Sequence, residues 1–144
     1  MRIFIDTSII VEIERKDKKA LEMMEKLDHS EVLISAITVA EILTGSYLTR
    51  DFKSSALEAK KILGQFIWVD FDGGVAEKTG QLLSILISAG SPVSFQDTGI
   101  AASFLSSRSD FLVTLNKKDF MKIPGLEGKV FSPAEFLDFL KKGK

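Results

Sequence analysis

The order of apolar and polar residues along the chain predicts short buried strands separated by helices. The first strand is expected at Ile3 to Ile5, a wholly apolar run that ends on Asp6. An uninterrupted apolar run of this kind is typical of a strand buried on both faces of a parallel sheet. Further strands are expected at 32–34, 67–69 and 111–113, with an edge strand at 129–131.

The segments between these strands carry apolar residues at helical spacing. Gly90 is expected to end one helix, and Ser132 and Glu135 have the spacing of a capping box. The segment 114–119 is expected to be a polar turn. Helices are expected at 9–13, along the apolar stripe of Leu21, Met24 and Leu27, at 37–48, 52–66, 75–89 and 95–105, and from 132 onward.

This alternation of strands and helices predicts the fold class. Strands joined through helices form a parallel sheet with helices on both faces. We therefore expect an α/β fold with a central parallel sheet of four to five strands. At 144 residues, the chain is long enough for a sizeable core and is expected to be one domain, 1–144.

The composition narrows the possible chemistry. The chain has no cysteine, which excludes disulfides and thiolate metal ligands, and its one histidine, His29, lies in a polar turn. Histidine triads and histidine metal sites are therefore nearly excluded. A net charge of −1 means that nucleic-acid binding would have to rest on local patches. No signal peptide or long uncharged apolar span is recognisable, so the expected location is the cytoplasm, without a membrane partner.

Carboxylates occur at places where parallel strands end or helices begin. Asp6 ends the first strand, Glu41 and Asp97 lie early in two helices, and Asn116 and Asp119 follow the fourth strand. Ligand sites in open α/β sheets lie at the carboxyl ends of the strands. We therefore expect these side chains to converge at one edge of the sheet.

Helix capping is the structural alternative for these acids, because Glu41 and Asp97 each lie three residues after a hydroxyl residue. The helical faces favour a buried site instead, since Glu41 shares its face with Leu48, and Asp97 shares its face with Phe104. Buried carboxylates need partners, and clustered carboxylates repel one another. Such a cluster is expected to hold a divalent cation, and oxygen ligands without histidine or cysteine suit Mg²⁺ or Mn²⁺.

Four segments occur in an order and spacing that cover nearly the whole chain: 4–8 (Phe-Ile-Asp-Thr-Ser), 35–42, 96–102 and 113–120. In these segments the sequence resembles the PIN-domain nucleases, and among them the VapC-type toxins of prokaryotic toxin–antitoxin pairs. The resemblance implies a PIN-like three-layer fold. It assigns Asp6, Glu41 and Asp97 to the family's catalytic metal-site acids, and Thr7 and Thr114 to hydroxyl positions that support them.

The sequence departs from the family pattern at the fourth metal position. Asn116 lies two residues after the threonine, where the family often has an aspartate, and is at best a neutral ligand. Asp119 is close enough to help but is offset by one short turn. This departure leaves the occupancy of a second metal position open.

The resemblance implies a metal-dependent endoribonuclease that hydrolyses phosphodiester bonds in single-stranded or structured RNA and is inhibited by a small antitoxin. Lys16, Lys117 and Lys118 are candidate phosphate contacts, with ordinary solvated lysines as the alternative. Two other functions stay open at this point: a PIN nuclease of RNA processing without an antitoxin, and an inactive PIN-like module that binds RNA or protein. A phosphatase with Asp6 as nucleophile is less favoured because Ser8 replaces the expected second aspartate.

A homodimer is also expected, because VapC-like proteins commonly pair through helices from the middle of the chain. The apolar residues that suggest a surplus over the needs of one core are Phe52, Leu57, Leu82, Leu83 and Leu86. The alternative is that all of them belong to the core.

Overall fold

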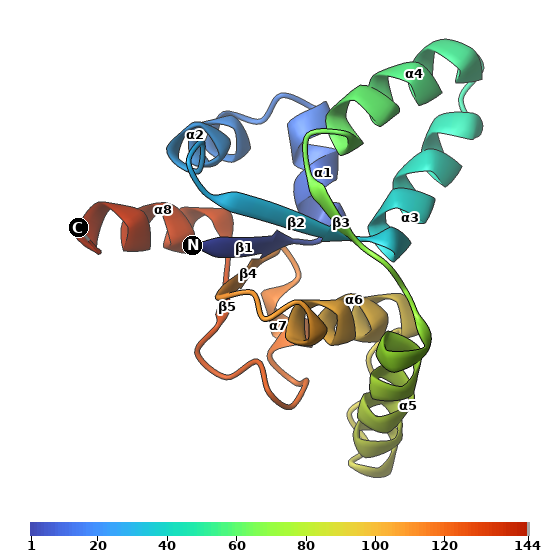
Figure 1. The fold of residues 1–144 in the computed structure, drawn as a ribbon, viewed down its shortest axis with the longest axis vertical. Helices are drawn as coiled ribbons and strands as arrows, with labels where there is room; N and C mark the ends of the chain where they lie inside the picture. Colours follow the sequence, from blue (N-terminus) through green and yellow to red (C-terminus); the bar gives the residue numbers. More distant parts are fainter. Residues whose placement is uncertain (144) are drawn as a thin grey trace.

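The computed structural model describes residues 1–143 and confirms the α/β prediction (Figure 1). Within these residues, five parallel strands form one sheet in the order β3-β2-β1-β4-β5. The first strand of the chain lies at its centre, and the last lies at an edge, as expected. The strands are β1 (Arg2–Ile5), β2 (Glu31–Ser35), β3 (Ile67–Val69), β4 (Phe111–Val113) and β5 (Val130–Phe131).

The central position of β1 follows from its apolar side chains. Ile3, Phe4 and Ile5 are fully buried. Because side chains alternate along a strand, Ile3 and Ile5 pack into the core on one face of the sheet, and Phe4 packs into the core on the other. The strand that carries Asp6 at its end is therefore held from both sides.

Helices cover both faces of the sheet in the three-layer arrangement that the sequence predicts (Figure 1). One face packs against α1, α2, α3, α4 and α8, and the other packs against α5, α6 and α7. The helices within residues 1–143 are α1 (Thr7–Glu14), α2 (Lys18–Lys26), α3 (Ala36–Tyr47), α4 (Phe52–Leu63), α5 (Gly73–Ser88), α6 (Phe95–Ser106), α7 (Lys117–Phe120) and α8 (Pro133–Lys142).

Local signals explain several helix ends. Gly90 follows the C-cap of α5 with φ +68°, the left-handed conformation that glycine adopts readily. Ser132 and Glu135 form the predicted capping box of α8. The helix expected over 52–66 ends earlier, at Leu63, because its C-cap is Gly64, a poor helix former.

The predicted buried stripe of α2 was wrong in register. The structure buries Ala20 and Met23, whereas Leu21 is 40% exposed and Met24 is only partly buried. Only Leu27 lies in the core as expected. The reason is tertiary: α2 packs between α1 and α8, and these neighbours select the buried face.

The predicted surplus of apolar surface was also partly wrong. Leu82 and Leu86 of α5 lie in the core against α6 and the sheet, and Leu83 is partly buried. Phe52 and Leu57 are exposed, by 45% and 58% of their surface. They belong to α4, which forms with α3 a hairpin that extends beyond the sheet (Figure 1).

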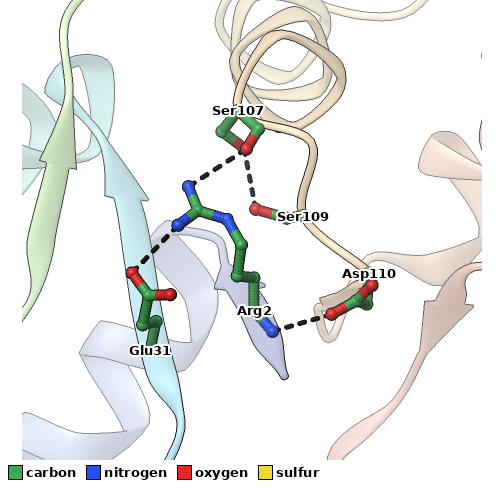
Figure 2. Close-up of polar contacts among 5 residues, drawn as sticks. All are labelled: Arg2, Glu31, Ser107, Ser109 and Asp110. Carbon is green, nitrogen blue, oxygen red and sulfur yellow. Dashed lines mark hydrogen bonds and ion pairs between the residues drawn. The ribbon is translucent and has the colours of Figure 1, made fainter.

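A polar network fastens the amino end of β1 (Figure 2). The Arg2 guanidinium donates to Glu31 on β2 at 2.9 Å and to the carbonyl of Ser107 at the end of α6 at 3.0 Å. The backbone N–H of Arg2 donates to the Asp110 carboxylate at 2.8 Å. These contacts tie β1 to β2 and to the segment that leads into β4, at the opposite end of the strand from Asp6.

Candidate active site

Asp6 lies where β1 ends and α1 begins, beside the end of β4. Ile5 pairs with Val113, which brings Thr114 next to Asp6. Thr114 Oγ1 donates to Asp6 Oδ2 at 2.6 Å, and Ser8 Oγ donates to Asp6 Oδ1 at 2.6 Å. Asp6 is the N-cap residue of α1, but its side chain makes no capping hydrogen bond. The carboxylate is therefore held between the first turn of α1, through Ser8, and the end of β4, through Thr114.

The Asp6 carboxylate is 3% exposed and forms no ion pair with any residue of the described chain. Its pKa is raised to about 6. Burial is the largest cause and the negative charge of Asp97 acts in the same direction, while the hydroxyls of Ser8 and Thr114 lower the pKa. A buried acid with only neutral partners is costly unless a cation joins it. Asp6 therefore has the environment expected of a cation ligand.

Glu41 enters the same region from α3. Thr7 Oγ1 donates to Glu41 Oε1 at 2.7 Å and lies 3.0 Å from Thr38 Oγ1. The N-cap of α3 is Ser35, so Glu41 does not take part in a capping box with Thr38, which was the structural alternative for this acid. The expectation that Glu41 heads a buried stripe was wrong, because both Glu41 and Leu48 are exposed where α3 leaves the sheet.

Asp97 lies in the first turn of α6 and is partly buried. Its backbone N–H donates to Ser94 Oγ at 3.1 Å, which caps the helix, while its carboxylate accepts from Asn116 at 3.0 Å. Burial raises the pKa of Asp97; the amide of Asn116 lowers it, and the negative charges of Glu41 and Asp119 raise it.

Asn116 and Asp119 lie at the start of α7, a short helix within the segment that was expected to be a turn. The Asn116 amide nitrogen donates to Asp119 Oδ2 at 3.1 Å, and the Asn116 backbone N–H donates to Thr114 Oγ1 at 2.9 Å. Lys122 lies 3.2 Å from Asp119 Oδ1. The Asn116 hydrogen bond and the Lys122 ammonium hold the pKa of Asp119 below its usual value.

The structure thus brings the four predicted acids to one edge of the sheet. There the negative charge of Asp97 raises the pKa of Asp6, and the charges of Glu41 and Asp119 raise the pKa of Asp97. Within residues 1–143, however, no three acidic or histidine side chains are arranged around one point that could hold a metal ion. Hydroxyls and an amide take the carboxylate oxygens instead. The donor chemistry fits a hard divalent cation, and side-chain rotation would be needed to bind it.

The predicted basic residues are arranged unevenly around these acids. Lys117 pairs with Glu135 of α8 at 2.8 Å, and this contact lowers the pKa of Glu135 to about 2. Lys118 is exposed on α7 beside Asp119. Lys16 lies beyond the far end of α1, a helix about 12 Å long that starts next to Asp6, so it does not flank the acids as expected.

The sequence interpretation overlooked two features. The first is Ser8, whose hydroxyl holds Asp6 and accepts from the backbone N–H of Leu115 at 3.0 Å. The serine two residues after the acid was its only signal in the sequence. The second is a groove of about 500 Å³ beside the site, between α1, α3 and α4, whose acids include Glu14 and Glu58. No sequence motif marks this groove.

Comparisons with known proteins show the family of this chain. The family model described as PIN domain matches residues 3–126. The tRNA(fMet)-specific endonuclease VapC of Shigella flexneri is 24% identical over 132 residues, which cover 92% of this chain and 99% of that protein.

Solved structures show the same fold. The DNA-bound VapBC structure from Salmonella typhimurium matches with a TM-score of 0.81 and 27% identity, over 92% of this chain and 98% of that one. VapBC2 from Rickettsia felis, bound to a DNA fragment from its promoter, matches with a TM-score of 0.82 and 24% identity, over the same shares of both chains.

Proposed function

Because this chain belongs to the PIN-domain family, we propose that it is a divalent-metal-dependent endoribonuclease of the VapC type, a toxin inhibited by a cognate antitoxin. The observation that carries the proposal is the Asp6 carboxylate. It is buried at the carboxyl end of the central strand, its hydrogen-bond donors are neutral groups, chiefly the hydroxyls of Ser8 and Thr114, and the charge of Asp97 acts on it. A helix cap or an ordinary surface acid does not need this environment.

Mg²⁺ or Mn²⁺ is the proposed cofactor, held by Asp6, Glu41 and Asp97 with help from Asp119. Asn116, expected as a neutral ligand, turns its amide nitrogen and not its carbonyl toward Asp97 and Asp119. A divalent cation at such a site neutralises charge on the scissile phosphate and makes an attacking water more acidic. The chain's own hydroxyls orient the acids: Thr114 and Ser8 fix Asp6, and Thr7 fixes Glu41. These hydrogen bonds hold the carboxylates near one another, and a cation would bind them after a change of side-chain rotamers.

RNA is the proposed substrate, and transfer RNA is the first class to test, since the relative from Shigella flexneri is named a tRNA(fMet)-specific endonuclease. Lys118, exposed beside Asp119, is the best placed of the predicted phosphate contacts. Within residues 1–143, no helix is both long and apolar enough to cross a membrane. We propose a cytoplasmic location because the proposed RNA substrate is found there.

The proposed antitoxin contact is the groove between α1, α3 and α4. Its charged residues within the described chain are three acids, Glu14, Glu41 and Glu58, and its walls include the apolar Val11 and Ile42. Burial raises the pKa of Glu14, although the positive charge of Arg15 lowers it. A cationic partner would therefore stabilise the ionised carboxylate of Glu14. An acidic, partly apolar groove repels phosphates and suits a basic amphipathic protein segment. The similar structure from Salmonella typhimurium is named a DNA-bound VapBC, and another from Klebsiella pneumoniae is named a toxin–antitoxin complex.

Cleavage of labelled tRNA and of a single-stranded RNA, with Mg²⁺ or Mn²⁺ and with chelator, tests the proposal. Wild-type protein should cut at least one substrate, and chelator or Asp97→Asn should abolish cutting while the circular dichroism spectrum stays unchanged. Asp17→Ala is the matched control: Asp17 caps α2 away from the acids, and its loss should leave cleavage intact. Cutting by Asp97→Asn at the wild-type rate in chelator would refute the nuclease assignment.

A second candidate function is a PIN-like module that binds RNA or protein without catalysis. It is favoured by one observation, that no three acids of residues 1–143 surround one point. The same assay separates the two, since such a module would retain an RNA under all conditions and cut none. An active nuclease without an antitoxin would be distinguished by an inhibition assay, because no basic protein would inhibit its cleavage of RNA.

A further inference from the structure

Asn116 makes an unexpected use of its side chain. Asparagine at the N-cap of a helix ordinarily accepts hydrogen bonds from the first turn. Asn116 is the N-cap of α7, yet its side chain makes no capping hydrogen bond. Its amide nitrogen donates instead to Asp97 Oδ2 at 3.0 Å and to Asp119 Oδ2 at 3.1 Å.

The chemistry of the groups fixes the orientation of this amide. An ionised carboxylate only accepts hydrogen bonds, so the NH₂ group and not the carbonyl must face both acids. The amide has two hydrogens, and one is available for each carboxylate. A neutral side chain thus bridges two negative charges from α6 and α7, where a cation would be the usual bridge.

The backbone of Asn116 is fixed as well. Its N–H donates to Thr114 Oγ1, and the same hydroxyl donates to Asp6. One residue therefore connects three of the proposed metal ligands, through its side chain to Asp97 and Asp119 and through Thr114 to Asp6.

We propose that Asn116 is a positioning residue whose amide crosslinks Asp97 and Asp119 in the metal-free protein and competes with the divalent cation for Asp97. The inference rests on the proposed function, since it concerns the same metal site. A cation that binds Asp97 must displace the amide, so the crosslink weakens metal affinity and keeps the acids paired until the ion concentration is high enough. An aspartate at this position could not act in this way, because it has no hydrogen to donate.

The test uses a property of the sequence: Asn116 is the only asparagine in the chain. Labelling asparagine side chains with ¹⁵N gives one NH₂ pair in the NMR spectrum. In chelator, these hydrogens should exchange slowly with water. Addition of Mg²⁺ should move the signals and speed their exchange, with the same midpoint as Mg²⁺ binding measured by calorimetry.

Two substitutions separate competition from the other roles of Asn116. Asn116→Ala removes the crosslink, so the metal-free protein should melt at a lower temperature, while Mn²⁺ should bind about tenfold more tightly. Leu115→Ala, an exposed neighbour, is the control and should change neither quantity. Weaker Mn²⁺ binding by Asn116→Ala would show a ligand and not a competitor, and unchanged binding would show a purely structural role; either overturns the inference.

The outcomes also distinguish this inference from the proposed function. Binding of Mg²⁺ by the wild-type protein with NH₂ signals that do not move would overturn the competition alone and leave the nuclease proposal standing. Absence of Mg²⁺ and Mn²⁺ binding by both the wild-type protein and Asn116→Ala would overturn both proposals.

Discussion

The hydroxyl of Thr114 donates a 2.6 Å hydrogen bond to the carboxylate of Asp6, although the two residues lie 108 positions apart in the chain. Ser8 donates an equally short bond to the other oxygen. Both donors are neutral, and burial dominates the pKa of Asp6, which rises to about 6. Ionisation of Asp6 therefore opposes folding in the absence of a cation.

The stability of the metal-free protein should reveal this carboxylate through its pH dependence. Between the unfolded pKa of 3.8 and the folded pKa of about 6, the folded state binds more protons at Asp6 than the unfolded state. The contribution of Asp6 to the free energy of unfolding should therefore fall as pH rises through this range. Urea denaturation in chelator, compared between wild type and Asp6→Asn, isolates the contribution. Parallel pH profiles for the two proteins would contradict it.

Asp6→Asn should have opposite effects on stability and activity. At pH 7 the metal-free variant should be as stable as the wild type or more stable, by up to about 3 kcal/mol, because the buried charge is removed. Cleavage of RNA should be lost, since the charge that holds the cation is gone. Asp17→Ala should show the reverse pattern, a loss of about 1 kcal/mol with full activity. An Asp6→Asn protein that is less stable and still active would support a capping role.

Metal binding should release protons from the raised-pKa acids. Asp6 and Asp97 both hold protons more tightly in the metal-free protein than ordinary aspartates do, and a bound cation favours their ionised forms. Calorimetric titration with Mn²⁺ at pH 6, in two buffers of different ionisation enthalpy, should give different heats. The proton count should decrease when the titration is repeated at pH 8. Equal heats in both buffers at pH 6 would be evidence against the coupling.

Much of the fold and the identity of the acids could be predicted because they depend on local patterns. A fully apolar run ending on Asp6 marks a central strand and its carboxyl end at once. The exposure of Glu41 could not be predicted in this way. A helical-face argument assumes that the helix packs against the sheet along its whole length, whereas α3 leaves the sheet to pair with α4 (Figure 1).

Contacts between distant segments were beyond the reach of the sequence. The pairing of Lys117, a predicted RNA contact, with Glu135 depends on how α7 meets α8. The amide bridge of Asn116 likewise depends on the placement of α6 against α7. Spacing along the chain identifies the residues of such a site, but the hydrogen bonds among them follow from the tertiary packing.

The Arg2 network should contribute to stability and not to activity. Arg2→Met keeps much of the apolar stem but removes the hydrogen bonds to Glu31 and to the Ser107 carbonyl (Figure 2). Because Arg2 is partly exposed, a loss of about 1–2 kcal/mol in the free energy of unfolding is expected, with an unchanged cleavage rate. Thermal and urea denaturation measure the first quantity, and the RNA assay measures the second. A loss of activity in the folded variant would show that the two ends of β1 are coupled.

Self-association should depend on the apolar surface of the α3–α4 hairpin. Phe52 and Leu57 of α4 are exposed, and Tyr47 of α3, which lines the same shallow pocket, is 51% exposed, an arrangement that a second copy of the chain could cover. Leu57→Lys would place a charge in such an interface, where burial of a leucine is worth about 2 kcal/mol, and should convert a dimer to a monomer.

Light scattering at tens of micromolar, roughly the scale of a weak interface, should give a dimer mass for the wild type and a monomer mass for Leu57→Lys. Leu21→Lys, an exposed leucine on α2, is the control and should remain dimeric. Because the core of the monomer already contains Leu82 and Leu86, the α4 substitution should leave the melting temperature of the monomer unchanged. A wild-type protein that is monomeric at these concentrations would refute the dimer, and the exposed leucines would then be left for another protein to cover.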